Sequence, residues 1–464
     1  MRSWIKPTLL VMLLLALCWA GTVAYWRTTN HLPSSSDLVI YLLVLPVLLL
    51  SALLLGRGLV GLIGPAPALA FAAPGAAPGQ ASAPATPDAQ HVPPLAILAC
   101  ALRSPHGASP AELAAALAAN TARADLDPEL VNEDGFPVMT ARHGDPGDEA
   151  VQDEVREWLA EQGMGEVRFE PEQWRALALG SSVVEQLCAQ AASSLLLPDA
   201  VPPTLHLLPL LPQEWHMEAR SAAGMWLRHK AVSAGWPDGK LALAAELPMA
   251  TASPVDAMAR LAIHGAATEA PVLALIIACA SHVGDDSISA WSGKGVLFSA
   301  KRPQGLVPGE GAAGLLLLDQ EQAARIDSAS PMLHMVNDAR RHNSADEAKR
   351  ADADLLAVLA DKLLLNAKSG APDVAMLVAD TGHRTSRVLE LMGLAGKTLP
   401  ELDKATDVVS LGPGCGTCGA VPFMTALAMA SHYALERSAP VLCISNEDPY
   451  RRSAVLVRPA LILS

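Results

Sequence analysis

Two cysteines in a glycine-rich segment are the residues whose spacing most directly suggests chemistry. Residues 411–420 read LGPGCGTCGA and contain Cys415 and Cys418 in a Cys-x-x-Cys spacing. Such a pair is typical of a redox dithiol or of half a zinc site. A helix predicted over 421–436 follows directly, and a helix N-terminus lowers the pKa of a thiol. The segment is therefore compatible with a redox pair, a metal site or a close-packed turn.

A structural zinc site would need further ligands beside this pair. The other cysteines of the globular part are single residues in predicted strands or helices, where cysteine usually serves as a small buried apolar side chain: Cys100, Cys188, Cys279 and Cys443. His282, Asp285 and Asp286 share one loop, but their spacing is more typical of a solvated acidic loop. We therefore predict no metal and no cofactor.

Ser253 and His383 are two further candidates. Ser253 precedes Pro254, and this order is typical of an N-cap followed by the first residue of a helix. A serine without an adjacent base is a poor nucleophile near neutral pH. His383 follows a strand predicted over 374–380. We interpret Ser253 as a helix cap and keep His383 as a candidate.

The elements that must position these residues alternate between strands and helices. Apolar runs predict strands over 95–102, 204–212, 240–248, 271–280, 311–319, 374–380, 439–445 and 453–459. Helical patterns cover 110–121, 151–163, 181–196, 254–265, 351–367 and 421–436. This alternation predicts an α/β fold with a largely parallel, covered sheet.

The N-terminal part is predicted to be embedded in a membrane. Residues 8–25 and 37–56 are apolar runs of about the ~20 residues that cross a bilayer. Arg2, Lys6 and Arg57 flank the pair and outnumber the positive charges of the connecting loop, which places both ends in the cytoplasm. A cleaved signal is the alternative for the first run. We prefer a two-helix transmembrane hairpin in a bacterial inner membrane.

This interpretation divides the chain into three parts. The hairpin occupies residues 1–63, a Pro/Ala/Gly-rich linker occupies 64–94, and a globular domain facing the cytoplasm occupies 95–464. The formal net charge of −14 argues against a nucleic-acid partner, because phosphate neutralisation needs clustered Lys and Arg. Seven scattered cysteines do not form the pattern of a secreted disulfide framework.

One segment of the domain carries a family resemblance. Residues 301–318, KRPQGLVPGEGAAGLLLL, resemble the Gly-Glu-Gly stretch of β-ketoacyl synthases, members of the thiolase-like superfamily. The similarity continues in order over most of 95–464. It implies two stacked halves in a five-layer α-β-α-β-α arrangement, usually as a homodimer. It also implies decarboxylative condensation of acyl chains by a cysteine at a helix N-terminus, assisted by two histidines.

The resemblance also assigns positions to the family's functional residues. The nucleophilic cysteine is expected near 248–253, where the hydroxyls belong to Thr251 and Ser253. His383 stands near the first histidine, and Cys415 replaces the second. The turn that lines the family's acyl tunnel carries Glu447, Asp448 and Arg451, which we expect to fill it. A structural role is expected for Gly309, Glu310, Gly311, Gly414, Gly416 and Gly419.

These departures predict a protein that is not an enzyme. It would be a membrane-anchored adaptor or scaffold for protein partners, such as a secretion effector or an acyl carrier protein. A basic island could contact an acidic partner or form an exposed helix face: Arg340, Arg341, His342, Lys349 and Arg350. The alternatives are an acyl-transfer or condensing enzyme that uses Cys415 with His383, and a redox-sensing scaffold that uses Cys415 and Cys418.

Overall fold

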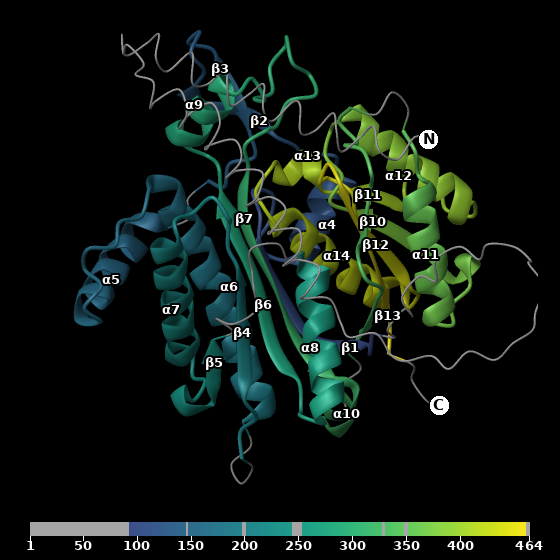
Figure 1. Ribbon diagram of the computed structural model, residues 1–464, viewed down its shortest axis with the longest axis horizontal. Coiled ribbons are helices and arrows are strands. Elements are labelled where there is room, and N and C mark those ends of the chain that lie inside the picture. Colours follow the sequence, from purple (N-terminus) through teal and green to yellow (C-terminus); the bar gives the residue numbers. More distant parts are fainter. Residues whose placement is uncertain are drawn as a thin grey trace, which may run out of the picture. The chain divides into compact units, whose positions relative to one another are not determined.

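The structure is a computed structural model (Figure 1) that describes residues 92–144, 147–196, 201–243, 253–326, 330–347 and 351–460. The predicted transmembrane hairpin and all but the end of the linker lie outside these residues, as does the second half of the strand predicted over 240–248. Within the described ranges, no helix combines the length and the apolar composition that a bilayer crossing requires.

The described chain alternates strands and helices. The main sheet contains β1 (Leu95–Arg103), β4 (Leu205–Leu210), β5 (Leu241–Leu243), β6 (Leu273–Ser281), β7 (Glu310–Asp319), β8 (Met332–Met335), β9 (Ala339–Arg340), β10 (Met376–Ala379), β11 (Val408–Ser410), β12 (Val441–Ser445) and β13 (Arg451–Arg458). A separate hairpin is formed by β2 (Asp125–Val131) and β3 (Pro137–Thr140). The helices are α4 (Pro110–Ala118), α5 (Asp148–Glu161), α6 (Pro171–Leu195), α7 (Met217–Ser233), α8 (Pro254–Thr268), α9 (Asp285–Gly293), α10 (Gln320–Arg325), α11 (Asp354–Asn366), α12 (Thr385–Thr398), α13 (Gly412–Cys415) and α14 (Val421–Arg437).

The sheet is mixed, so the prediction of a largely parallel sheet is wrong. Its order is β11-β10-β12-β13-β8-β1-β7-β6-β4-β5, with β9 paired to β13. Parallel pairs occur toward its two ends, whereas β6, β7, β1, β8, β13 and β12 pair antiparallel through the centre. A strand that is covered on both faces is apolar throughout in either direction, so its composition does not reveal the direction of its neighbour.

Three apolar clusters divide the domain into five layers. Leu207 and Leu275 face α6 and α7, whereas Leu208 and Ile276 of the same strands face the central helices α8 and α14. The strands of the C-terminal half repeat this alternation and present residues such as Leu442 to α11 and α12. In Figure 1, the two central helices accordingly lie between the strands of the two halves. This confirms the predicted α-β-α-β-α order.

Local signals at helix ends were predicted with mixed success. Ser109 and Ser253 are the N-caps of α4 and α8, each followed by proline, as predicted. Helix α8 does not end at Gly265 but continues to Thr268, because Glu269 takes the left-handed conformation at φ 51°. Gly265 instead permits close packing, since a β-carbon there would lie 2.2 Å from Cγ2 of Val272.

Candidate functional site

A cavity of about 1160 Å³ lies between the two halves of the domain. Strands β4, β10 and β12 end at its wall, and the N-termini of α8, α12 and α14 also reach it. Ligands of open α/β sheets bind at the carboxyl ends of strands, which is the position of this cavity. Its charged lining residues are Glu214, Arg302, Asp346, Asp380, Arg384, Glu447, Asp448 and Arg451.

Ser253 lies at the edge of this cavity and contacts a buried carboxylate. Its hydroxyl accepts a hydrogen bond of 3.0 Å from the N–H of Asp256 and donates one to Oδ2 of Asp338. Ser253 is 5% exposed, and the side chain of Asp338, which lies between β8 and β9, is 10% exposed. The N-terminus of α8 therefore presents a hydroxyl that has a base directly beside it.

The surroundings of Asp338 determine its protonation. Burial raises its pKa to about 6, against the lowering effect of hydrogen bonds from Ser253 and Ser453 and of the charge of Arg451. Nε of Arg451 lies 3.9 Å from Oδ2 of Asp338. Oδ1 of Asp338 is buried and takes part in no hydrogen bond among the described residues. Above about pH 6, Asp338 is thus a carboxylate with one unused acceptor atom.

Asp380 is a second buried acid and, unlike Asp338, lines this cavity, but its oxygens are occupied. It accepts hydrogen bonds from the Ser445 hydroxyl at 2.5 Å and from the N–H groups of Asn446 and Glu447 at 2.9 and 3.3 Å. Burial raises its pKa to about 6. These contacts hold the turn after β12, which indicates a structural role for Asp380.

The charged turn between β12 and β13 lines the cavity and does not fill it, which corrects our expectation. Glu447 is held by Arg384 at 2.7 Å and also accepts from the N–H of Gly382. Arg384 contacts Asp346 at 2.9 Å, and the fully buried Arg387 contacts Asp346 at 2.7 Å. These ion pairs fix the turn as part of the wall.

Cys415 and Cys418 lie in the core. Both belong to the central apolar cluster, and both are free thiols. Sγ of Cys418 donates to the carbonyl oxygen of Cys415 at 3.4 Å. Burial raises the pKa of Cys415 to about 12 and that of Cys418 well above its ordinary value. Both sulfurs are therefore protonated at neutral pH, which disfavours a nucleophile or a reactive dithiol.

His383 lines a small cavity beside Asp380 and Gly412, and Cys415 is not among the residues of that cavity. Its ring packs edge-on against Phe298, and burial lowers its pKa. Its Nε2 atom has no hydrogen-bond partner among the described residues. The structure thus places His383 beside Asp380 and not beside Ser253 in the main cavity.

The Gly-Glu-Gly segment and the glycines of 412–419 pack against one another. A β-carbon on Gly309 would lie 2.0 Å from the carbonyl oxygen of Cys415, and a β-carbon on Gly416, which is at φ +63°, would lie 2.8 Å from Cα of Gly309. Glu310 is buried and pairs with Arg175 at 2.6 Å. Three further glycines follow the same pattern of close or strained backbone: Gly311 beside Arg103, Gly414 beside Ala122, and Gly419 at φ +61°.

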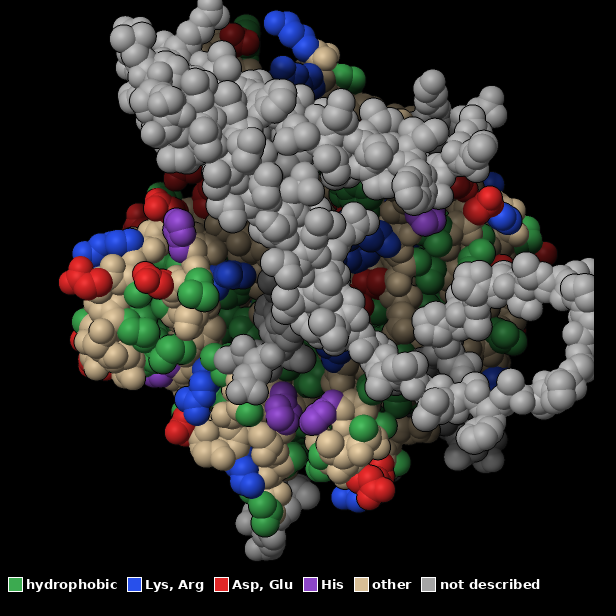
Figure 2. Space-filling view, viewed as in Figure 1, with side chains coloured by type: hydrophobic (Ala, Val, Ile, Leu, Met, Phe, Trp, Pro, Cys, Tyr) green, Lys and Arg blue, Asp and Glu red, His purple; other side chains and the backbone are tan. Residues whose placement is uncertain are grey.

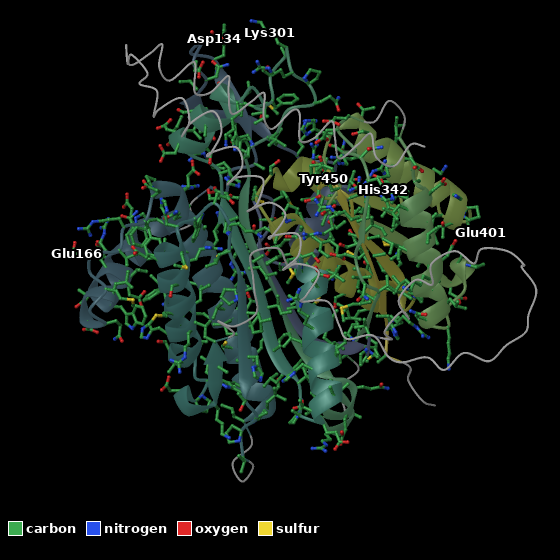
Figure 3. The ribbon with its side chains drawn as sticks, viewed as in Figure 1. Asp134, Glu166, Lys301, His342, Glu401 and Tyr450 are labelled. Carbon is green, nitrogen blue, oxygen red and sulfur yellow. The ribbon has the colours of Figure 1, made fainter. Side chains whose placement is uncertain are left out.

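The described residues contain no group of three or more side chains suited to holding a metal ion. His282 instead contacts Ser287 through Nδ1 at 3.2 Å and Glu214 through Nε2 at 3.3 Å. In the basic island, Arg341 pairs with Glu390 at 2.9 Å, and Arg340 lies over the ring of Tyr450. Figure 3 shows Tyr450 and His342 labelled near each other on the C-terminal half. Lys349 and Arg350 are outside the described residues.

Comparison with solved structures identifies proteins of similar fold. The ketosynthase from module 6 of the bacillaene synthase of Bacillus subtilis 168 matches with a TM-score of 0.51 and 11% identity, covering 79% of this chain and 72% of that one. A β-ketoacyl synthase from Burkholderia phymatum STM815 matches with a TM-score of 0.49 and 14% identity, covering 79% and 99%. The chain has the thiolase-like fold. No protein-family model and no curated protein matches the sequence.

The comparisons correct one prediction, that the chain is not an enzyme. The bacillaene synthase ketosynthase is an enzyme, and the described residues do not show that a catalytic centre has been lost. The prediction treated Ser253 as a hydroxyl without a base. Asp338, which lies 85 residues away in the sequence, was missed because nothing in its loop marks it as a partner of Ser253.

Proposed function

We propose that this chain is an acyl-transfer enzyme of the thiolase-like fold that carries its acyl group on Ser253. One observation carries the proposal: Ser253 stands at the N-terminus of α8, at the edge of the cavity, and its hydroxyl donates a hydrogen bond to Asp338. A serine becomes a nucleophile when an adjacent base takes its proton. The acyl-transfer alternative of the sequence interpretation is thereby kept, with the nucleophile moved from Cys415 to Ser253.

The position of Ser253 also suits the charge that develops during acyl transfer. Attack on a carbonyl places negative charge on its oxygen, and the positive end of a helix stabilises such charge. Helix α8 has 15 residues and points its N-terminus toward the cavity. The guanidinium of Arg451 lines the same wall. Both features support chemistry at Ser253.

The proposal includes delivery of the acyl group at a membrane. The apolar runs 8–25 and 37–56 support tethering of the domain on the cytoplasmic side, and a protein partner such as an acyl carrier protein would supply the substrate to a homodimer. Arg302 at the cavity and the neighbouring, exposed Lys301 support an acidic partner. Over much of the face seen in Figure 2, however, acidic and basic side chains are interspersed. Membrane fractionation of the full chain tests the tether.

The experiment for the acyl-serine uses the full-length protein with two probes, a fluorophosphonate and p-nitrophenyl acetate. Peptide mass spectrometry should locate the adduct on Ser253. Ser253→Asn should abolish it while keeping a good N-cap, because asparagine caps helices as well as serine does. Ser109→Asn is the matched control, since Ser109 is also an N-cap followed by proline. Folded protein that stays unlabelled, or that carries the adduct on Cys415, would overturn the proposal.

A further inference from the structure

We infer that Ser253 and Asp338 form a catalytic dyad that transfers acyl groups from an ester or thioester to an oxygen acceptor, water or an alcohol, and not to a carbon nucleophile. This inference rests on the proposed function and names its reaction class and its base. It differs from the condensation that the family resemblance implies. The hydrogen bonds and charges around the two side chains carry it.

The first observation is the difference between the two buried acids of the site. Oδ2 of Asp380 accepts a hydrogen bond from the Ser445 hydroxyl, and Oδ1 accepts one from the N–H of Asn446. Both oxygens of Asp380 therefore stabilise the turn after β12. Asp338 accepts from Ser253 through Oδ2, whereas its Oδ1 atom is buried without a hydrogen bond among the described residues. A buried polar atom without a partner calls for an explanation in a folded protein. Asp338 is not among the residues that line the cavity, so an acceptor hydroxyl would approach Oδ1 past Ser253, which does line it.

The second observation is the charge of the cavity wall. Condensation requires an enolate, whose negative charge needs hydrogen-bond donors such as two histidines. Among the described residues, the charged lining of the main cavity consists of five carboxylates and three arginines, and no histidine lines it; His383 lies at the small neighbouring cavity, which shares Asp380 and Glu447 with the main one. Two of the arginines lie against carboxylates, Arg384 against Glu447 and Arg451 against Asp338. The excess of carboxylates disfavours an enolate, and carboxylates accept protons from hydroxyl groups. The site is therefore suited to oxygen nucleophiles.

The steps balance without any further reactant. Oγ of Ser253 attacks the acyl carbon and forms a C–O bond while its proton moves to Oδ2 of Asp338. The bond from the acyl carbon to the leaving oxygen or sulfur then breaks, and the leaving group takes the proton from Asp338. Water or an alcohol next gives its proton to Asp338 and attacks the acyl-serine. The Ser253 C–O bond breaks, and the serine regains the proton.

The surroundings of the dyad support this proton transfer. Asp256 on α8 and Arg451 on β13 are the charged groups that act on Asp338, and Ser453 on β13 donates a hydrogen bond to it. The two charges oppose each other, so burial dominates and keeps the carboxyl less acidic than in water. General bases work best when their pKa lies near the working pH.

The test compares the full-length wild type with Asp338→Asn and with Glu401→Gln. Glu401 is an exposed carboxylate at the periphery of the domain in Figure 3 and is the matched control. The burst of p-nitrophenol measures acyl-serine formation as a function of pH. We expect Asp338→Asn to slow the burst by about 100-fold or more and to remove the rise of the rate near pH 6, whereas the control retains both. Asp338→Glu, which keeps a carboxylate, should recover part of the rate.

The acceptor is tested with the same proteins in H₂¹⁸O. The released acid should contain ¹⁸O, and added glycerol should be acylated in competition with water. A carbon–carbon product from malonyl and acyl thioesters would overturn the assigned reaction class. An acyl-serine that forms equally fast in Asp338→Asn, with the same pH dependence, would overturn the dyad and leave the proposed function intact. If the wild type forms no acyl-serine, the proposed function itself fails.

Discussion

Gly309 and Cys415 touch through their backbones, because the carbonyl oxygen of Cys415 occupies the space that a side chain on residue 309 would need. This contact joins the residue before β7 to the turn that precedes α14. An isolated bridge between Pro308 and Thr417 lies next to it. The contact explains why glycine is required at both segments. The Cys-x-x-Cys spacing thus belongs to a packed junction.

A methyl group at this junction should be costly. In Gly309→Ala the new β-carbon would lie 2.0 Å from the Cys415 oxygen, so the two segments must separate. We expect a loss of about 2 kcal/mol or more in the free energy of unfolding, as for other overpacked cores. Urea unfolding measures it. Gly239→Ala is the control, because nothing lies within 4 Å of its added β-carbon.

The stability of an Asp338→Asn variant should depend on pH in a defined direction. Burial raises the pKa of Asp338 from 3.8 to about 6, so between these values the folded protein binds more protons than the unfolded chain. The stability that protonated Asp338 contributes is present below the lower value and is lost as the pH rises through the higher one. The shift between these two pKa values corresponds to at most about 3 kcal/mol in the free energy of unfolding.

Asparagine at position 338 cannot ionise and can still accept a hydrogen bond from Ser253. Asp338→Asn should therefore unfold at a higher urea concentration than the wild type at about pH 8 and at a similar one near pH 4. A variant that is less stable than the wild type at both pH values would show that Asp338 serves the fold and not the reaction. A gain in stability together with a loss of activity is expected of a catalytic carboxylate.

Glu390 should be among the most sensitive charged residues. It is 2% exposed and pairs with the fully buried Arg452 through two hydrogen bonds of 2.8 and 2.9 Å, and with Arg341. Glu390→Gln would leave a buried guanidinium without its counter-charge, at a cost of about 3–5 kcal/mol. Glu321→Gln, which breaks the exposed pair with Arg325, should leave the melting temperature unchanged. Equal effects of the two variants would contradict the burial argument.

The cysteines should be inert in the folded protein. Burial raises the pKa of Cys415 to about 12, so its thiolate is scarce at neutral pH. Iodoacetamide should therefore modify Cys415 and Cys418 only after unfolding. In Ser253→Cys the new thiol at the N-terminus of α8 should be alkylated in the native protein, which mass spectrometry can resolve. Rapid alkylation of native Cys415 would contradict the structure.

The sequence predicted features that depend on local patterns. The run at 95–102 is β1, and the Ser-Pro pairs at 109 and 253 cap helices. Helix α6 was predicted from residue 181 but begins at Pro171, where Glu170 and Gln173 form a capping box. Features that depend on distant parts of the chain were missed. The direction of β7 and the approach of Asp338 to Ser253 follow from topology, and no local pattern encodes either.

The turn between β12 and β13 shows why side-chain type alone misled the prediction of a filled tunnel. Its charged residues were expected to occupy the space that faces them. In the structure, Glu447 pairs with Arg384, and Nε of Arg451 lies 3.9 Å from Asp338, so these side chains form part of the cavity wall. The volume of the cavity depends on these pairings, which sequence inspection cannot provide.

One sheet runs through both halves, and strands from both ends of it reach the cavity. A small molecule bound there would contact parts of the chain that are more than 200 residues apart in the sequence, such as Leu210 and Ser445, and would hold them together. Its binding free energy would add to the resistance of the whole domain to heat, by an amount that grows with ligand concentration. Thermal shift against a library of esters and thioesters could therefore find the natural substrate before any turnover is observed.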